Sequence, residues 1–254
     1  MSFAVSRDAY DRFMGRYSRE LAPRLIEFGR IESGMRVVDV GCGPGALTER
    51  LAERIGPEQV AAVDPSESFV AACAERVRGA DVRLAEAEEL PWPDESFDAA
   101  LAQLVVNFMR DAQAGVSEMR RVVRQAGIVT ACTWDYAGEM TMLRTFWDSA
   151  RALDSEAPDE QATRFTHQDG LRELWEEVGL NDIETGDLVV ETTYAGFDDF
   201  WEPLTFGVGP AGWYSASLGA EQREALRAEL YQRLGSPEGP FALTARAWAV
   251  RGVR

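Results

Sequence analysis

The first half of the chain alternates between short apolar runs and segments in which apolar residues recur every three or four positions. The apolar runs end at polar or glycine residues, as buried parallel strands do. These expected strands span residues 35–40, 59–63, 81–85, 97–101 and 128–134. The segments between them predict helices over 46–52, from Ser66 onward, and over 111–125. Strands and helices in alternation predict an α/β fold with a parallel sheet.

Helical spacing also covers the region from about residue 7 to residue 30. Pro23 would lie near the start of a second helix, so we expect a break close to Ser18. Arg16 and Tyr17 lie beside this expected break. They belong either to a plain amphipathic covering helix or to a flap that closes over a ligand.

The second half of the chain predicts helices over 139–153 and 220–234 and strands over 181–193 and 241–250. Thr166 as N-cap and Asp169 three positions later predict a capped amphipathic helix. Residues 194–219 are rich in aromatic residues and glycine, and we interpret them as a loop-like insert. Its aromatic side chains either form the core of a small cap or line an apolar pocket with a lid hinged at the glycines.

A glycine-rich turn follows the first expected strand, with Gly41, Gly43 and Gly45 at every second position. Glycine permits a sharp turn and a close approach of the backbone to a ligand. Three interpretations are open at this point. The turn fits the dinucleotide fingerprint through Gly41, Gly43 and Ala46, it fits a D-x-G-x-G-x-G pattern that begins at Asp39, or it is a tight turn without a ligand.

The D-x-G-x-G-x-G pattern resembles motif I of the class I S-adenosylmethionine-dependent methyltransferases, in particular the small-molecule branch with its ubiquinone/menaquinone-type domains. Residues 86–98 extend this resemblance with Glu-Ala-Glu, Leu-Pro and Pro-Asp-Glu-Ser-Phe-Asp. Dinucleotide enzymes have no reason to carry this block. The resemblance covers about residues 36–133. It implies a doubly wound, Rossmann-like sheet of seven strands in the order 3-2-1-4-5-7-6, with an antiparallel last strand.

The same resemblance implies S-adenosylmethionine as cofactor. Asp39 and the turn backbone would hold its methionine end, and Glu86 with Ala87 its adenine, although Asp is commoner than Glu at that position. Asp64 lies 23 residues beyond Gly41, at the end of the next strand, which suits an acceptor for ribose hydroxyls. The expected cofactor-binding residues are Arg16, Tyr17, Asp39, Gly41, Cys42, Gly43, Asp64, Pro65, Ser66, Glu86, Ala87, Glu88 and Gln103. For Gln103 the alternative is that it holds the loop backbone.

Composition restricts the possible partners. The 254 residues carry 26 basic and 43 acidic side chains, a net charge of −17, so nucleic acid and anionic membranes are disfavoured as targets. Three cysteines without C-x-x-C spacing argue against a disulfide framework and a zinc site, and we expect no metal. The sequence has no apolar stretch of transmembrane length and no signal peptide, so we expect a cytoplasmic protein, monomeric or homodimeric.

We expect one domain over residues 1–254, with N-terminal helices (1–33), a cofactor-binding core (34–134) and a completing segment (135–254) that contains the cap insert. The expected function is methyl transfer to a small, apolar or aromatic acceptor. His167, the only histidine, is either an exposed helix-start residue or a general base. Asp135, Tyr136 and Glu202 are further guesses for a base. The alternatives are an NAD(P)-dependent oxidoreductase, against which Pro44 counts because it lacks an N–H, and a non-catalytic S-adenosylmethionine-binding protein.

Overall fold

The structure is a computed structural model that describes residues 7–161 and 164–254. Its contacts divide the chain into two compact units, each assembled from three segments. Unit 1 comprises Met1–Tyr17, Asp135–Thr163 and Val189–Arg246, and unit 2 comprises Ser18–Trp134, Arg164–Leu188 and Ala247–Arg254. Residues 1–6 of the expected N-terminal region lie outside the described residues. The expectation of a single domain stays a prediction.

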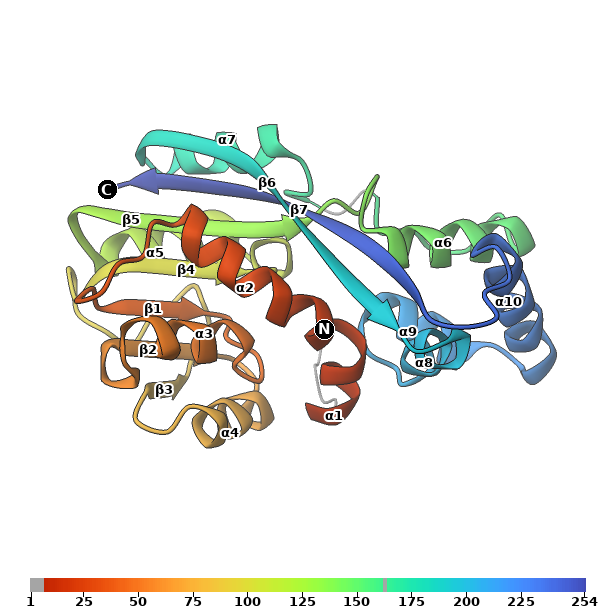
Figure 1. Ribbon diagram of the computed structural model, residues 1–254. Helices are drawn as coiled ribbons and strands as arrows, with labels where there is room; N and C mark the ends of the chain where they lie inside the picture. Colours follow the sequence, from red (N-terminus) through yellow and green to blue (C-terminus); the bar gives the residue numbers. More distant parts are fainter. Residues whose placement is uncertain (1–6, 162–163) are drawn as a thin grey trace. The chain divides into compact units, whose positions relative to one another are not determined.

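The chain forms a seven-stranded sheet in the order β3-β2-β1-β4-β5-β7-β6 (Figure 1). Its strands are β1 (Val37–Val40), β2 (Val60–Asp64), β3 (Asp81–Leu84), β4 (Phe97–Gln103), β5 (Val123–Trp134), β6 (Asn181–Tyr194) and β7 (Phe241–Val253). Neighbouring strands from β3 to β5 run parallel, whereas β7 runs antiparallel to β5. The predicted strand order and the antiparallel last strand are therefore confirmed. Residues 189–194 of β6 and 241–246 of β7 belong to unit 1.

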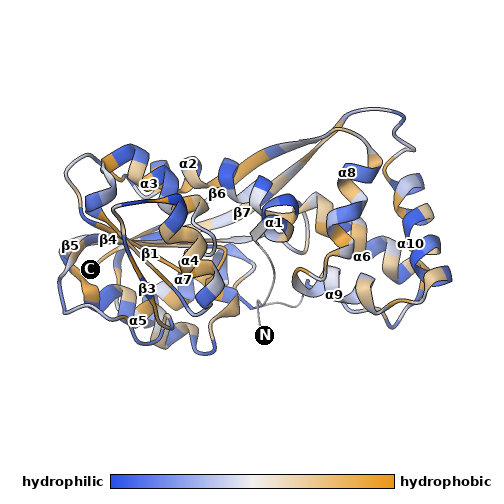
Figure 2. Cartoon of the chain, turned by 90° about the horizontal axis from the view of Figure 1, so that it is seen from below, coloured by the Kyte–Doolittle hydropathy of each residue, from blue (hydrophilic) through white to orange (hydrophobic). Residues whose placement is uncertain are grey.

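Helices cover both faces of the sheet in unit 2 (Figure 1, Figure 2). Helices α5 (Ala112–Val122) and α7 (Gln168–Glu177) pack on one face, and α3 (Ala46–Ile55) contacts β1 and β2 on the other. Every residue of β1 and β2 is buried, as the apolar runs predicted. Val38 and Val40 join the apolar cluster with α5 and α7. Because side chains alternate along a strand, Asp39 between them points to the α3 side.

The N-terminal helical region departs from the prediction. Helix α1 (Arg7–Tyr10), a π-helical turn (Asp11–Gly15) and α2 (Arg16–Phe28) follow one another directly. The expected break near Ser18 is wrong, because the irregularity lies in the π-helical turn and Pro23 lies inside α2. Pro23 is exposed, and a proline within a helix removes one backbone hydrogen-bond donor without ending α2 here.

Unit 1 is largely helical in the region that was interpreted as a loop. Within residues 194–219 the chain forms α8 (Phe197–Trp201), a 3-10 turn (Glu202–Thr205) and α9 (Gly209–Ser217), so the loop interpretation is wrong. Prolines at the starts of the last two elements favour helical entry. The aromatic residues of α8 are buried, as expected for the core of a cap. The acceptor-pocket interpretation stays a prediction.

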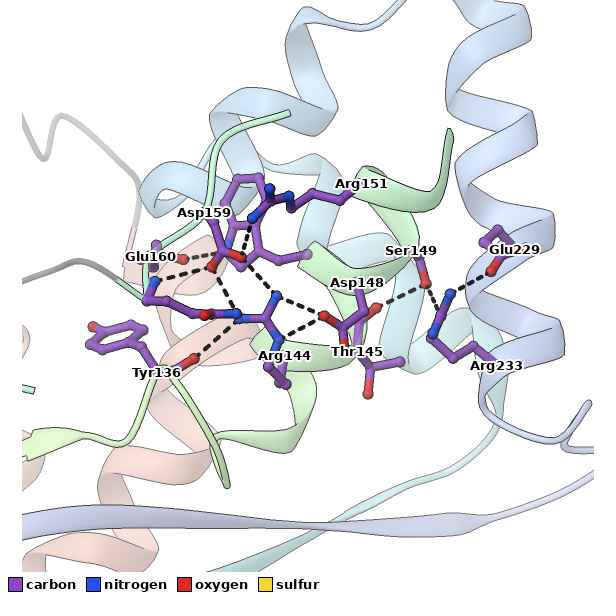
Figure 3. A network of polar contacts seen from close by, with 12 residues as sticks. Tyr136, Arg144, Thr145, Asp148, Ser149, Arg151, Asp159, Glu160, Glu229 and Arg233 are labelled. Carbon is purple, nitrogen blue, oxygen red and sulfur yellow. Dashed lines mark hydrogen bonds and ion pairs between the residues drawn. The ribbon is translucent and has the colours of Figure 1, made fainter. Parts of the chain in front are cut away.

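A polar network ties α6 (Thr141–Leu153) to neighbouring segments of unit 1 (Figure 3). Arg144 forms a bidentate ion pair with Asp159, at 3.0 and 2.9 Å, and also contacts Asp148 at 2.8 Å. Farther along the helix, Ser149 accepts a hydrogen bond from Arg233 of α10 (Ala220–Arg233) at 3.1 Å. The contacts with Asp159 and Arg233 join α6 to segments outside the helix, and they fix the position of α6 within unit 1.

Candidate active site

The turn after β1 is sharp because three glycines adopt left-handed backbone angles. The φ angles of Gly41, Gly43 and Gly45 are 75°, 52° and 95°, a region that glycine occupies without steric cost. A Cβ at Gly41 would lie 2.5 Å from the Val105 side chain, so packing requires glycine there. At Gly43 a Cβ would meet no atom of the described residues within 4 Å. The turn therefore leaves open space beside Gly43.

Most backbone N–H groups of this turn donate within the protein. Those of Gly41 and Cys42 donate to the Val63 carbonyl at 2.8 and 2.9 Å, and that of Gly45 donates to the Cys42 carbonyl at 3.0 Å. The Gly43 N–H donates to Asp64 Oδ2 at 2.9 Å. Pro44 has no N–H to donate. The turn consequently offers carboxylate charge, rather than free amide donors, to a ligand.

Asp39 is the most deeply buried acid of this region, at 1% exposure. Its Oδ2 accepts a hydrogen bond from the Thr48 hydroxyl at 2.6 Å, and its Oδ1 has no partner among the described residues. Burial raises the pKa of Asp39 to about 7, partly offset by the Thr48 hydrogen bond, and the nearby Asp64 charge raises it further. Thr48 was not among the predicted site residues. Its position in the first turn of the helix that follows the glycines is the signal that could have indicated it.

Asp64, at the end of β2, holds the backbone on two sides. Its Oδ2 accepts from Gly43 and its Oδ1 accepts from the Ser66 N–H, both at 2.9 Å. Burial raises the pKa of Asp64 despite these two hydrogen bonds, and the charge of Glu86 adds to the rise. Pro65 and Ser66 lead directly into α4 (Glu67–Arg76), for which Ser66 is the N-cap residue as predicted. Asp64 therefore organises the turn in addition to its expected role at the ribose.

The segment after β3 is joined to the segment after β4. The Glu86 carboxylate pairs with Arg110 at 3.0 Å, and Glu88 Oε1 accepts from the Asp111 N–H at 3.1 Å. Ala87 between them is buried, whereas the Glu86 side chain remains 47% exposed. The expected adenine-binding residues thus lie at the carboxyl edge of the same sheet as Asp39 and Asp64. Their contact with a cofactor stays a prediction.

At the end of β4 the Gln103 amide is divided between two roles. Its Nε2 donates to the Ser18 carbonyl at 3.0 Å. Its Oε1 accepts no hydrogen bond from the described part of the chain. The next residue, Leu104, adopts a φ of 63°, a strained angle of the kind found at functional sites. Gln103 therefore holds the backbone, as one interpretation expected, and still has an oxygen available to a ligand.

Arg16 and Tyr17 belong to unit 1, whereas the other expected cofactor residues belong to unit 2. Arg16 forms a bidentate ion pair with Asp199 at 3.2 and 2.8 Å, and its guanidinium lies 4.6 Å from the Tyr194 ring centre. The Tyr17 and Tyr194 hydroxyls are 2.8 Å apart. These contacts tie the start of α2 to β6 and α8 within unit 1. A role of either residue at the cofactor stays a prediction.

The candidates for a general base differ in how far their side chains are already engaged. His167 is exposed and is the N-cap residue of α7, so the predicted N-cap Thr166 is wrong by one position. Asp135 pairs with Arg246 at 2.7 Å and accepts from two backbone N–H groups. Glu202 pairs with Arg12 at 2.7 Å. Tyr136 is buried. The exposure of His167 agrees with the interpretation of an exposed helix-start residue, and a role as a base stays a prediction.

Three further properties concern the described residues as a whole. In ranges 7–161 and 164–254, no group of three or more histidine, cysteine or acidic side chains is placed to hold a metal ion. All three cysteines are buried free thiols. No helix in these ranges combines the length and the apolar character needed to cross a bilayer.

The sheet order and the glycine turn that leads from β1 to α3 define an α/β class that also appears in comparisons with known proteins. Residues 38–131, all in unit 2, match the family model described as a methyltransferase domain. This match shows that residues 38–131 form a methyltransferase domain, and the seven-stranded order 3-2-1-4-5-7-6 is similar to that of the class I S-adenosylmethionine-dependent methyltransferases.

Individual relatives are distant. The chain is 30% identical over 132 residues to malonyl-acyl carrier protein O-methyltransferase of Yersinia pestis, covering 52% of this chain and 48% of that one. It is 28% identical to a ubiquinone/menaquinone biosynthesis C-methyltransferase of Burkholderia orbicola, covering 63% and 72%. A solved S-adenosylmethionine-dependent methyltransferase from Aquifex aeolicus shares the fold, with 20% identity, coverage of 70% and 87%, and a TM-score of 0.52. The match spans about half the length of the first of these relatives.

Proposed function

We propose that this chain transfers the methyl group of S-adenosylmethionine to a small apolar or aromatic acceptor. The observation that carries the proposal is the acidic glycine turn. Asp39 and Asp64 lie buried at the ends of adjacent strands, and the turn between them directs its N–H groups into the protein. A ligand with positive charge and hydroxyl donors matches such a site, whereas a phosphate does not.

The residues fit the amino-acid and sugar parts of this cofactor. Asp39 Oδ1 and Gln103 Oε1 are buried acceptors that lack a partner in the described ranges, and an ammonium group supplies the donors that they need. Asp64 and Glu86 carry the carboxylates that would accept from ribose and adenine donors. A side chain at Gly43 would fill the open space beside the turn, so glycine there keeps room for the ligand.

The bound cofactor supplies a methyl group on positively charged sulfur, which is already activated for displacement. The protein's own contribution is to hold the acceptor in line with that methyl group and to exclude water. An acceptor that is already nucleophilic needs no strong base. For an oxygen acceptor that must lose a proton, His167 is the proposed base, since its side chain is exposed and an imidazole nitrogen can accept a proton.

The oxidoreductase alternative meets a physical obstacle at the turn. A pyrophosphate needs backbone N–H donors, and the donors of Gly41, Cys42 and Gly43 are already used within the protein. The Asp64 carboxylate beside Gly43 would also repel a phosphate. A non-catalytic binding protein remains the second alternative, and only an assay of turnover separates it from an enzyme.

Calorimetric titration and a methyl-transfer assay test the proposal together. We expect S-adenosylmethionine and S-adenosylhomocysteine to bind and NAD(P) not to bind. The acceptor panel should include a malonyl thioester and hydroxylated aromatic rings, since two relatives are named for malonyl-acyl carrier protein and for quinone biosynthesis. Tight cofactor binding without methylation of any acceptor would favour the non-catalytic alternative, and binding of NAD(P) alone would reverse the proposal.

The remaining expectations about partners belong to the same proposal. A net charge of −17 supports a protein that binds neither nucleic acid nor anionic membranes. We propose a cytoplasmic enzyme that acts as a monomer or homodimer. Size-exclusion chromatography with light scattering would distinguish these two states from a larger assembly.

A further inference from the structure

We propose that Thr48 is a positioning residue for the amino-acid end of the cofactor. Its side-chain hydroxyl holds one oxygen of the Asp39 carboxylate, so that the other oxygen stays available to the ligand's ammonium group. The inference rests on the proposed function, because it concerns the same cofactor site. It assigns a role to a residue that touches neither the cofactor nor the acceptor directly.

The geometry of the Thr48–Asp39 contact is that of a short, buried, charge-assisted hydrogen bond. The Thr48 hydroxyl donates to Asp39 Oδ2 at 2.6 Å, and Thr48 and Asp39 are exposed by only 0% and 1%. The Thr48 backbone N–H contributes a second hydrogen bond to the same carboxylate. Asp39 Oδ1, in contrast, has no partner within residues 7–161 and 164–254. The carboxylate is therefore fixed on one side and unsatisfied on the other, at a considerable cost unless a ligand provides a donor.

Cys73 settles the direction of the Thr48 hydroxyl. Its thiol donates to Thr48 Oγ1 at 3.4 Å, which uses the hydroxyl as an acceptor and leaves its single proton for Asp39. Cys73 itself packs against the glycine turn, because a Cβ at Gly45 would lie 3.0 Å from its sulfur. A continuous set of contacts thus connects the turn, through Cys73 and Thr48, to the carboxylate.

The same contact controls the charge of Asp39. Burial raises the pKa of Asp39 to about 7, and the Thr48 hydrogen bond opposes that rise. The other titratable groups that face this region are Asp64, whose charge also raises the pKa of Asp39, and the thiols Cys42 and Cys73, which sense the Asp39 charge. Loss of the Thr48 hydroxyl would move the pKa of Asp39 upward, so that less of the carboxylate is ionised at neutral pH.

Two substitutions separate the hydroxyl from the packing role of the side chain. Thr48→Val keeps the branched shape and removes the hydroxyl, whereas Thr48→Ser keeps the hydroxyl and removes a methyl group. The probes are S-adenosylhomocysteine and 5′-methylthioadenosine, which lacks the amino-acid part. Affinities are measured by calorimetry between pH 6 and pH 9, after thermal melts establish that each variant folds.

We expect Thr48→Val to weaken S-adenosylhomocysteine binding at pH 7 by about fivefold, because a one-unit rise from a pKa of about 7 lowers the ionised fraction of Asp39 from about a half to about a tenth. Affinity should recover toward the wild-type value at pH 9, because Asp39 then ionises in the variant as well. Binding of 5′-methylthioadenosine should change by less than about twofold, since it carries no ammonium group to pair with Asp39. Thr48→Ser should restore the wild-type pH profile.

A double-mutant cycle combines Thr48→Val with Asp39→Asn. If Thr48→Val is unstable, Thr48→Ala replaces it, so the proposal stays falsifiable. Removal of the hydroxyl should have no further effect once the charge of Asp39 is gone. Additive losses, or a wild-type profile in Thr48→Val with reduced affinity in Thr48→Ser, would overturn the positioning role and leave the proposed function standing. A wild-type chain that binds neither probe would overturn both.

Discussion

Asp64 shows how one side chain can serve both the backbone and a ligand. Each of its oxygens accepts one backbone hydrogen bond, from Gly43 or from Ser66, and a carboxylate oxygen can accept a second. The turn and the start of α4 are therefore fixed relative to the carboxylate. Any hydroxyl that the ligand places beside Asp64 would bind to a group whose orientation is already set, which lowers the entropic cost of binding.

Replacement of this carboxylate should weaken the cofactor complex. Asp64→Ala leaves ligand hydroxyls without their charged partner, so we expect S-adenosylhomocysteine affinity to fall by about 1–3 kcal/mol in calorimetry. Asp187→Ala, which removes an exposed acid of β6 in the same unit, is the matched control and should leave affinity unchanged. Equal affinity of Asp64→Ala and the wild type would remove Asp64 from the site.

Glu160, beside the network of Figure 3, makes the stability of the protein depend on pH. The side chain is 8% exposed, and burial raises its pKa to about 7 from 4.5, partly offset by a hydrogen bond from Trp147 Nε1 at 2.7 Å. The folded chain therefore keeps a proton that the unfolded chain loses. Unfolding releases this proton between about pH 4.5 and pH 7, so the free energy of unfolding falls as the pH rises through that range.

Glu160→Gln removes the titration and keeps an acceptor for Trp147. In urea unfolding at pH 5 and pH 8, the drop in the free energy of unfolding should become smaller by on the order of 1–3 kcal/mol. Part of the drop should remain, because the pKa of Asp39 is also raised in the folded chain and its titration acts in the same direction. Glu156→Gln, at an exposed position of the same segment, is the control. The same drop in all three proteins would contradict a protonated, buried Glu160.

At the scale of elements, the start of α2 is anchored by an ion pair that is only partly exposed. The Arg16 and Asp199 side chains are 19% and 31% exposed, and Arg16 also lies over the Tyr194 ring. Arg12 and Glu202 form a second pair in the same unit, but these side chains are 46% and 57% exposed. Exposed ion pairs contribute little to stability, whereas partly buried pairs with an aromatic contact contribute more.

Arg16→Ala should therefore lower the free energy of unfolding by about 1–2 kcal/mol, and Arg12→Ala by less than about 0.5 kcal/mol. A double-mutant cycle with Asp199→Ala should be non-additive, which isolates the pair from other contacts of Arg16. Equal effects of Arg16→Ala and Arg12→Ala would refute the anchoring role. Measurement of S-adenosylhomocysteine affinity in Arg16→Ala also tests whether this residue acts on the cofactor.

The elements that were predicted well are those whose local pattern and tertiary setting agree. The apolar runs of β1 and β2 are wholly buried, and the glycines between β1 and α3 have the positive φ angles that such a turn needs. β5 was expected from residue 128 but begins at Val123, because Val123 pairs with Phe97 of β4 ahead of a register shift, after which the pairing resumes at Ile128. Gly127 is required there, since a Cβ would lie 2.4 Å from Val123 and 2.6 Å from the Asp98 carbonyl.

Single-residue roles were harder to predict where they depend on partners distant in sequence. The strand-end acids Asp39 and Asp64 could be found from their spacing to the glycines. Nothing local to Glu86 indicates its ion pair with Arg110, and nothing local to Arg16 indicates Asp199. The role of the Thr48 hydroxyl was equally hard to predict, because the direction of its hydrogen bond depends on Cys73, 25 residues away. The fold follows from local pattern, whereas these contacts require tertiary structure.

At the scale of the whole molecule, the family match concerns one unit, whereas the net charge concerns the entire chain. The family match at residues 38–131 lies wholly in unit 2, which also contains the acidic turn. Unit 1 lies outside that match and contains the helical insert with its buried aromatic residues. The net charge of −17 disfavours polyanionic partners for the molecule as a whole. Unit 2 therefore supports the proposal of the cofactor.

The measurement that tests the central claim most directly is a crystal structure of the chain grown with S-adenosylhomocysteine. We expect the amino-acid end of the ligand at Asp39 and the glycine turn, its ribose at Asp64 and its adenine beside Glu86. Density for the ligand elsewhere, or a dinucleotide with its pyrophosphate at Gly43, would contradict this assignment.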